Sequence, residues 1–67
     1  MNDQDDLRRK AIELQAVRDQ GDEFIALIQS LGRMNGDAGR EFALAKTKIQ
    51  EAVMWACAGL TKELKDG

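Results

Sequence analysis

The sequence contains no histidine, no proline and no tyrosine, and it has a single cysteine. Without histidine, the chain lacks the commonest general base, the commonest zinc ligand and the usual pH switch. The lone Cys57 cannot form a disulfide within the chain, which excludes a secreted disulfide scaffold. Because Cys57 lies in an apolar run, we interpret it as a buried, inert thiol. We therefore expect a protein that is not an enzyme and that needs neither a metal nor a cofactor.

Long apolar runs are also absent. The longest one, from Ala52 to Leu60, is about half as long as a membrane span. The acidic segment 1–6 has no apolar stretch behind it, which predicts that no signal peptide is present. The net charge of -2 argues against binding to polymeric nucleic acid, which needs a broad basic surface. We expect a small, soluble, cytoplasmic protein.

The residues that are abundant favour helices. Ala, Leu, Glu, Lys, Gln and Arg dominate the 67 residues, and these residue types lose little conformational freedom in a helix. The sequence predicts an all-α fold. A chain of this length supports only a marginal hydrophobic core, so we also expect association between copies.

A glycine-rich segment divides the chain into two helical stretches. The first covers about residues 5–31, the turn covers 32–39, and the second helix covers about 40–65. Gly32 occupies the position of a left-handed C-terminal cap, and Asp37 that of an N-cap for the second helix. So short a connection predicts a single domain, an antiparallel two-helix hairpin.

Gly21 interrupts the first helical stretch. It predicts either a kink or a stop after which Asp22 caps a new helix. The absence of proline and the continuous charge pattern favour a kink. Beyond this point Phe24 belongs to an apolar repeat that continues through Leu27 and Leu31, which predicts a core position for Phe24.

The second helix is apolar on two sides. One stripe faces the partner helix, whereas Leu44 and Trp55 point roughly the opposite way. A two-helix hairpin has only one internal face, so the second apolar side must be buried against another copy. We therefore predict a symmetric helical homo-oligomer with Leu44 and Trp55 at its interface. The stripe facing the partner helix consists of Phe42, Ala45, Ile49, Ala52, Val53, Ala56, Leu60 and Leu64.

The positive charges are clustered although the net charge is negative. Basic residues occur at 8–10, at Arg18, on both sides of the turn and at Lys46 and Lys48. The segment from Arg33 to Arg40 resembles a small anion-binding loop, because it combines glycine amides, a helix start and two guanidinium groups. A solvated surface explains the same residues, and their spacing alone leaves both interpretations open.

The segment Arg40–Ala56 reads REFALAKTKIQEAVMWA. It resembles the signature of small phage proteins, the anti-CBASS cyclic-oligonucleotide sponges, whose helical hairpin is shared with a class of Thoeris anti-defence sponges. The chain length and the glycine-rich turn agree with that family. The resemblance is strong over about 25 residues of the second half and looser over the first helix.

This resemblance implies a viral protein in the host bacterial cytoplasm that sequesters cyclic nucleotides without cleaving them. The family forms compact oligomers, typically hexamers, that bind cyclic dinucleotides such as cyclic GMP–AMP between protomers and cyclic trinucleotides at separate sites. Carried over by position, the ligand-binding candidates are Arg18, Arg40, Lys46 and Thr47, and Arg8 is added from the basic cluster. Some relatives stack a tyrosine on the base, and this chain has no tyrosine.

Two other functions stay open. A helical homo-oligomer could bind a host protein through the Leu44 and Trp55 face and have no small ligand. An enzyme that hydrolyses cyclic nucleotides is disfavoured, because the chain has neither a histidine nor a recognisable metal cluster.

Overall fold

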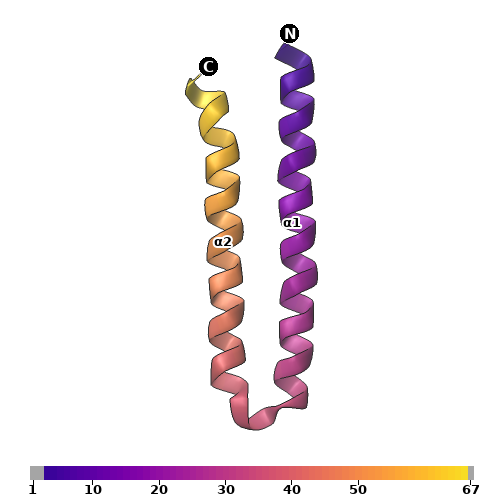
Figure 1. Cartoon of the computed structure of the whole chain (residues 1–67), viewed down its shortest axis with the longest axis vertical. Helices are drawn as coiled ribbons and strands as arrows, with labels where there is room; N and C mark the ends of the chain where they lie inside the picture. The colour runs from indigo at the N-terminus through magenta and orange to yellow at the C-terminus, as the bar shows by residue number, and fades with distance from the viewer. Residues whose placement is uncertain (1–2, 67) are drawn as a thin grey trace.

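The chain folds into an antiparallel hairpin of two long helices. The computed structural model describes the backbone of residues 3–66 and the side chains of residues 4–62. Helix α1 spans Asp3–Met34, a 3-10 turn η1 spans Gly36–Ala38, and helix α2 spans Gly39–Asp66. The helices run side by side, with both chain ends at the end opposite the turn, and the described residues contain no strand (Figure 1). The predicted all-α hairpin is confirmed.

The turn is shorter than the sequence predicts. Helix α1 continues to Met34, so Gly32 lies inside the helix, and no glycine in the described chain adopts a positive φ. The predicted left-handed cap at Gly32 is therefore wrong. Asn35 closes α1 instead: its backbone N–H and its side-chain Nδ2 both donate to the Leu31 carbonyl, at 3.0 and 2.9 Å. These two hydrogen bonds satisfy one of the last carbonyls of α1, which is the role that a capping glycine would otherwise have.

The start of α2 also differs from the prediction. Asp37 lies in the 3-10 turn, and α2 begins at Gly39, so Asp37 is not the N-cap residue. The Ala38 N–H donates to the Asn35 carbonyl at 2.9 Å, which tightens the turn. Glu41 does lie in the first turn of α2, where a carboxylate is stabilised by the helix dipole.

Helix α1 passes through Gly21 without a break, and Figure 1 shows no sharp bend there. The predicted kink or stop is wrong. The reason is packing: a Cβ placed on Gly21 would overlap Cγ2 of Val53 on α2. Glycine costs roughly 1 kcal/mol in a helix relative to alanine. At this position the close approach of the two helices compensates for that cost.

Little of the apolar stripe is buried within one hairpin. Ile49, at 9% exposure, is the only hydrophobic residue in the buried class among the described side chains. Val53 and Leu60 are half-buried, whereas Ala52 and Ala56 are exposed, and Leu64 lies outside the described side chains. The apolar stripe of α2 is therefore present, but α1 covers only the midline of the stripe and leaves its flanks exposed.

The predicted core position of Phe24 is wrong for the single hairpin. Phe24 is 51% exposed and Leu27 is 53% exposed, while Leu31 is half-buried. Their spacing correctly identifies an apolar side of α1, but α2 does not reach far enough around α1 to cover it. Cys57 is half-buried and free rather than fully buried.

Candidate ligand-binding face

Two close contacts fix how the helices lie against each other. Gly21 faces Val53, and a Cβ on Gly32 would lie 3.2 Å from Cβ of Phe42, so α1 and α2 run in a constant antiparallel register. Each residue turns a helix by about 100°. Residues beside this contact line therefore project to one or the other broad side of the hairpin.

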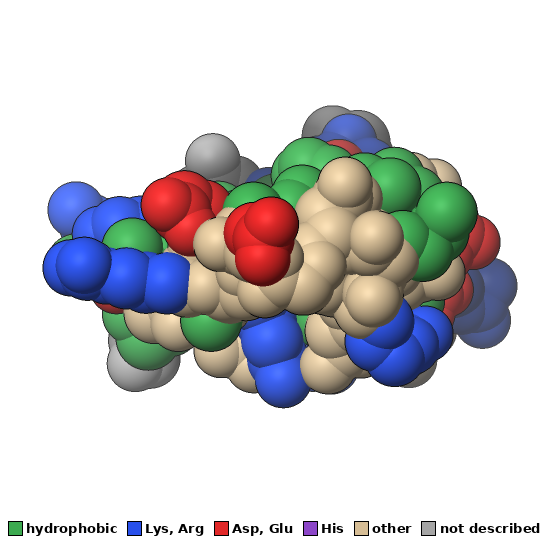
Figure 2. Space-filling model, turned by 90° about the horizontal axis from the view of Figure 1, so that it is seen from below, with side chains coloured by type: hydrophobic (Ala, Val, Ile, Leu, Met, Phe, Trp, Pro, Cys, Tyr) green, Lys and Arg blue, Asp and Glu red, His purple; other side chains and the backbone are tan. Residues whose placement is uncertain are grey.

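The two broad sides differ in chemistry. One side, which we call the basic face, carries Arg18, Gln29 and Arg33 from α1 and Lys46 from α2. The other side, the apolar face, carries a set of exposed hydrophobic residues. Viewed from the turn, Lys and Arg side chains lie at the left and along the lower edge of the molecule, and hydrophobic side chains gather at the upper right (Figure 2). The residues of the apolar face are Ala16, Phe24, Leu27, Leu44, Ala52, Trp55 and Ala56.

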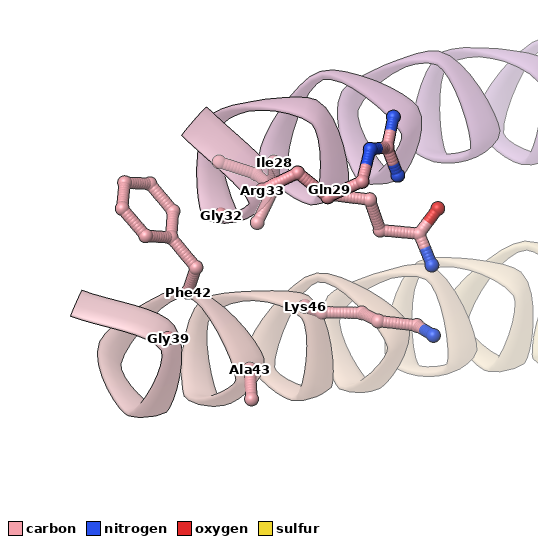
Figure 3. Close-up of a pocket in the computed structure, with 8 residues that line it drawn as sticks. All are labelled: Ile28, Gln29, Gly32, Arg33, Gly39, Phe42, Ala43 and Lys46. Carbon is pink, nitrogen blue, oxygen red and sulfur yellow. The ribbon is translucent and has the colours of Figure 1, made fainter. Parts of the chain in front are cut away.

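The basic face contains a cleft near the turn, which we call the closed-end cleft. It has a volume of about 410 Å³ and lies between the last turns of α1 and the first turns of α2. The polar ends of Gln29, Arg33 and Lys46 point the same way along the hairpin, while the Phe42 ring lies at the other end of the cleft (Figure 3). Its lining residues are Ile28, Gln29, Gly32, Arg33, Gly39, Phe42, Ala43 and Lys46.

The closed-end cleft is positively charged. No acidic residue lines it, and neither Arg33 nor Lys46 pairs with a carboxylate of the described residues. Lys46 is half-buried, with its stem along the cleft, and Arg33 is exposed. Two cations on different helices with no counter-charge between them make a site where an anion is favoured.

Three other cations in the hairpin are paired within a single helix. Arg9 lies 3.6 Å from Asp6, Lys10 lies 3.6 Å from Glu13, and Lys48 lies 3.7 Å from Glu51. These pairs connect neighbouring turns of one helix and are typical of a solvated helix surface.

The predicted ligand-binding residues are spread along the hairpin. Lys46 lines the closed-end cleft, and Arg18 lies on the same face, about 22 Å along α1 from Arg33 at the usual helical rise. Arg8 is exposed still farther towards the open end. A single protomer therefore brings Lys46 together with Arg33, but not with Arg18 or Arg8.

The structure does not bring Arg33 and Arg40 together over the turn. The hollow over the turn is lined by residues 34–38, including Asp37, and no cation lines it. Arg33 belongs to the closed-end cleft, and Arg40 is exposed at the start of α2 and lines neither hollow. Thr47 is exposed and its Oγ1 donates to the Ala43 carbonyl at 3.2 Å, which leaves its lone pairs available as acceptors.

Two residues of the cleft, Gln29 and Arg33, are absent from the ligand-binding residues predicted by sequence. Arg33 was recognised only as part of the loop, and Gln29 carries no signal of its own. Their placement beside Lys46 depends on the register of the hairpin, which a sequence pattern does not supply. The exact turn length would have given that register.

The predicted interface residues lie on the apolar face. Leu44 is 52% exposed and Trp55 is 68% exposed. Next to them an apolar groove of about 480 Å³ runs along the middle of the hairpin. Its lining residues are Ala16, Val17, Gln20, Gly21, Phe24, Ile49, Ala52, Val53 and Ala56.

The described residues contain no group of three or more metal-ligating side chains. Neither helix, over its described length, is long and apolar enough to cross a membrane.

The sequence matches a family model described as "Acb2/Tad1, hairpin domain" over residues 2–61, almost the whole chain. The chain belongs to this family. It is the family of anti-CBASS and anti-Thoeris sponges, so the resemblance seen in the second half is confirmed and extends across the first helix. No curated protein and no solved structure matches the chain.

Proposed function

We propose that the protein is a non-enzymatic phage anti-defence sponge that binds and sequesters cyclic dinucleotides, such as cyclic GMP–AMP, and cyclic trinucleotides. Family membership supports this most directly: the chain belongs to the Acb2/Tad1 family, and Arg18 and Lys46, which pair with no carboxylate of the described residues, lie on one face of the hairpin. Guanidinium and ammonium groups bind phosphate strongly when no carboxylate competes. Sequestration requires only this affinity and no chemical step.

The spacing of the candidate residues favours a site between copies. Arg18 lies three residues before Gly21 and is therefore level with Ala56 on α2, whereas Lys46 is level with Ile28. This separation is about 15 Å along the hairpin. We propose that a compact cyclic dinucleotide held by both residues takes each one from a different protomer. In this arrangement Arg8, Arg18 and Arg40 contact phosphates, and Lys46 and Thr47 contact phosphate or base edges.

Self-association has independent physical support. A 67-residue chain with one buried hydrophobic side chain in its described part has too small a core to be stable by itself. The apolar face is exposed whenever the hairpin is alone, so the partner that buries it must be present wherever the protein is. A second copy of the same chain meets that requirement. We propose a homo-oligomer, a hexamer by analogy with the family, assembled through Leu44, Trp55 and the neighbouring apolar groove.

The remaining expectations follow from this role. The protein acts in the cytoplasm of the infected bacterium, where cyclic nucleotide signals are made. Its partners are those second messengers and further copies of itself, without a membrane or polymeric nucleic acid, and it uses no cofactor.

The test is calorimetric titration with a panel of cyclic dinucleotides and trinucleotides. We expect saturable binding, weakened about tenfold or more by Lys46→Ala. Lys48→Ala is the matched control, because Lys48 lies on the same helix but pairs with Glu51 away from the cleft. Absence of heat with every ligand of the panel would contradict the proposal.

A second candidate function is favoured by Trp55, which is 68% exposed. An exposed tryptophan on an apolar face is a suitable anchor for a host protein. The size of the particle in solution separates the two functions. A monomer that keeps Trp55 exposed favours the host-binding protein, and a closed oligomer that buries it favours the sponge.

A further inference from the structure

We infer that the closed-end cleft is itself a phosphodiester-binding site, in which Arg33 and Lys46 hold the anion from two helices and Gln29 contacts the adjoining base. This inference rests on the proposed function, because the phosphodiester belongs to the cyclic nucleotide. It adds Gln29, which neither the sequence pattern nor the family match identifies, and it places Arg33 beside Lys46 rather than in a loop with Arg40.

The charges of the cleft need an explanation that the helices themselves do not give. An arginine in the last turn of α1 is favoured by the helix dipole, which accounts for Arg33 alone. Lys46 lies about two turns from the N-terminus of α2, where the helix dipole gives a cation no stabilisation. The two positive charges are nevertheless directed to one side of one cleft, and no acidic residue lines it (Figure 3).

The types of donor select the class of anion. A guanidinium group presents parallel N–H donors that match two non-bridging oxygens of a phosphate, and an ammonium group adds a second, less directional charge. The Gln29 amide both donates and accepts, so it suits the mixed edge of a nucleobase. Together these groups fit a singly charged phosphodiester with a base beside it.

The apolar part of the cleft favours a nucleotide over a bare anion. Ile28 and Phe42 line it too, with the Phe42 ring at the end away from the polar groups (Figure 3), and Gly32 and Gly39 contribute no side chains that would fill it. A Cβ on Gly32 would crowd Phe42 at 3.2 Å, so glycine at this position also keeps the Phe42 ring close to α1. An inorganic anion would leave this surface wet, whereas a nucleoside would cover it.

The experiment uses two probes and matched variants of the full chain. The first probe is a linear dinucleoside monophosphate, which carries one phosphodiester, followed by amide NMR signals of Gln29, Gly32 and Gly39. The second probe is cyclic GMP–AMP in a calorimetric titration. The variants are Arg33→Ala, Gln29→Ala and the control Arg9→Ala, an exposed arginine paired with Asp6 at the opposite end of the hairpin.

The inference expects the linear probe to shift the signals of the cleft residues and Arg33→Ala to weaken binding of both probes about tenfold or more. Gln29→Ala should weaken binding less, and Arg9→Ala should change it less than about twofold. If cyclic GMP–AMP binds but Arg33→Ala matches Arg9→Ala and the cleft signals stay unmoved, this inference is overturned while the proposed function stands. If the linear probe shifts the cleft but no cyclic nucleotide binds, the cleft is supported and the proposed function fails. Absence of binding by both probes overturns both.

Discussion

Val53 of α2 fills the space that a side chain at Gly21 of α1 would occupy. This contact lies near the middle of the hairpin, and a Cβ at Gly21 would prevent the helices from approaching as they do there. Together with the contact of Gly32 and Phe42 it sets the register, and the register places Lys46 beside Gln29 and Arg33. The geometry of the basic face therefore depends on two glycines inside a helix.

Gly21→Ala should destabilise the protein although alanine is the better helix former. The added methyl group overlaps the Val53 side chain, and overpacking of this kind typically costs about 1–3 kcal/mol. Urea unfolding at a fixed protein concentration measures the effect. Gly39→Ala is the control: Gly39 has helical backbone angles and a Cβ there meets nothing within 4 Å, so this variant should gain up to about 1 kcal/mol. Equal stability of the two variants would contradict the close contact.

A charge in the apolar groove should break the oligomer. Ala52 lines the groove, whereas Ala11 lies on the side of α1 that carries Arg18, and both are exposed in the lone hairpin. Ala52→Glu places a carboxylate in the interface and should weaken assembly by about 1–3 kcal/mol, whereas Ala11→Glu should leave it unchanged. Sedimentation velocity at several concentrations compares the two variants with the wild type. A monomeric wild type, or two variants that behave alike, would show that the groove is not covered by a second copy.

Trp55 reports on assembly by itself, because it is the only tryptophan of the chain. In the lone hairpin it is 68% exposed, so its emission should resemble that of tryptophan in water. In the oligomer we expect a shift to shorter wavelength that is lost on dilution, as the interface opens. Emission that stays at the solvent value at every concentration would remove Trp55 from the interface.

Arg18→Ala should weaken ligand binding without changing the size of the oligomer. Arg18 is exposed on the basic face and pairs with no carboxylate of the described residues, so the variant loses a phosphate contact and no contact within the hairpin. We expect a loss of about tenfold, measured by calorimetry with cyclic GMP–AMP, while sedimentation stays unchanged. Unchanged affinity would exclude Arg18 from the site.

The sequence predicted the hairpin well and its details less well. Residue types and apolar spacing indicate two helices and a turn, because these are local properties of the chain. Gly21 misled the prediction, since the low helix propensity of glycine is a local property and its contact with Val53 is not. We expected Gly32 to cap α1, but Asn35 caps it instead. Asn35 donates two hydrogen bonds to the Leu31 carbonyl, so no residue with a left-handed backbone is needed there.

The candidate site was predictable only in part. Lys46 followed from the family motif, and the structure places it in the closed-end cleft. Arg33 is recognisable as a cation near the turn, but the sequence pattern groups it with Arg40, whereas the structure places it in the closed-end cleft with Lys46. Its neighbours across the hairpin depend on a register that one residue of turn length changes. Phe24 shows that burial is also hard to predict from sequence. The periodicity identifies an apolar face, but it does not tell whether one neighbouring helix is enough to bury that face.

The central claim is that the protein holds a cyclic nucleotide without cleaving it. The most direct measurement mixes cyclic GMP–AMP with excess protein, filters the mixture, heats the retained fraction to denature the protein, and analyses the released ligand by chromatography. The account predicts that almost no ligand passes the filter before heating and that the full amount returns intact afterwards. Linear or monomeric nucleotides after heating would contradict it in favour of an enzyme, and ligand that passes the filter freely would contradict binding itself.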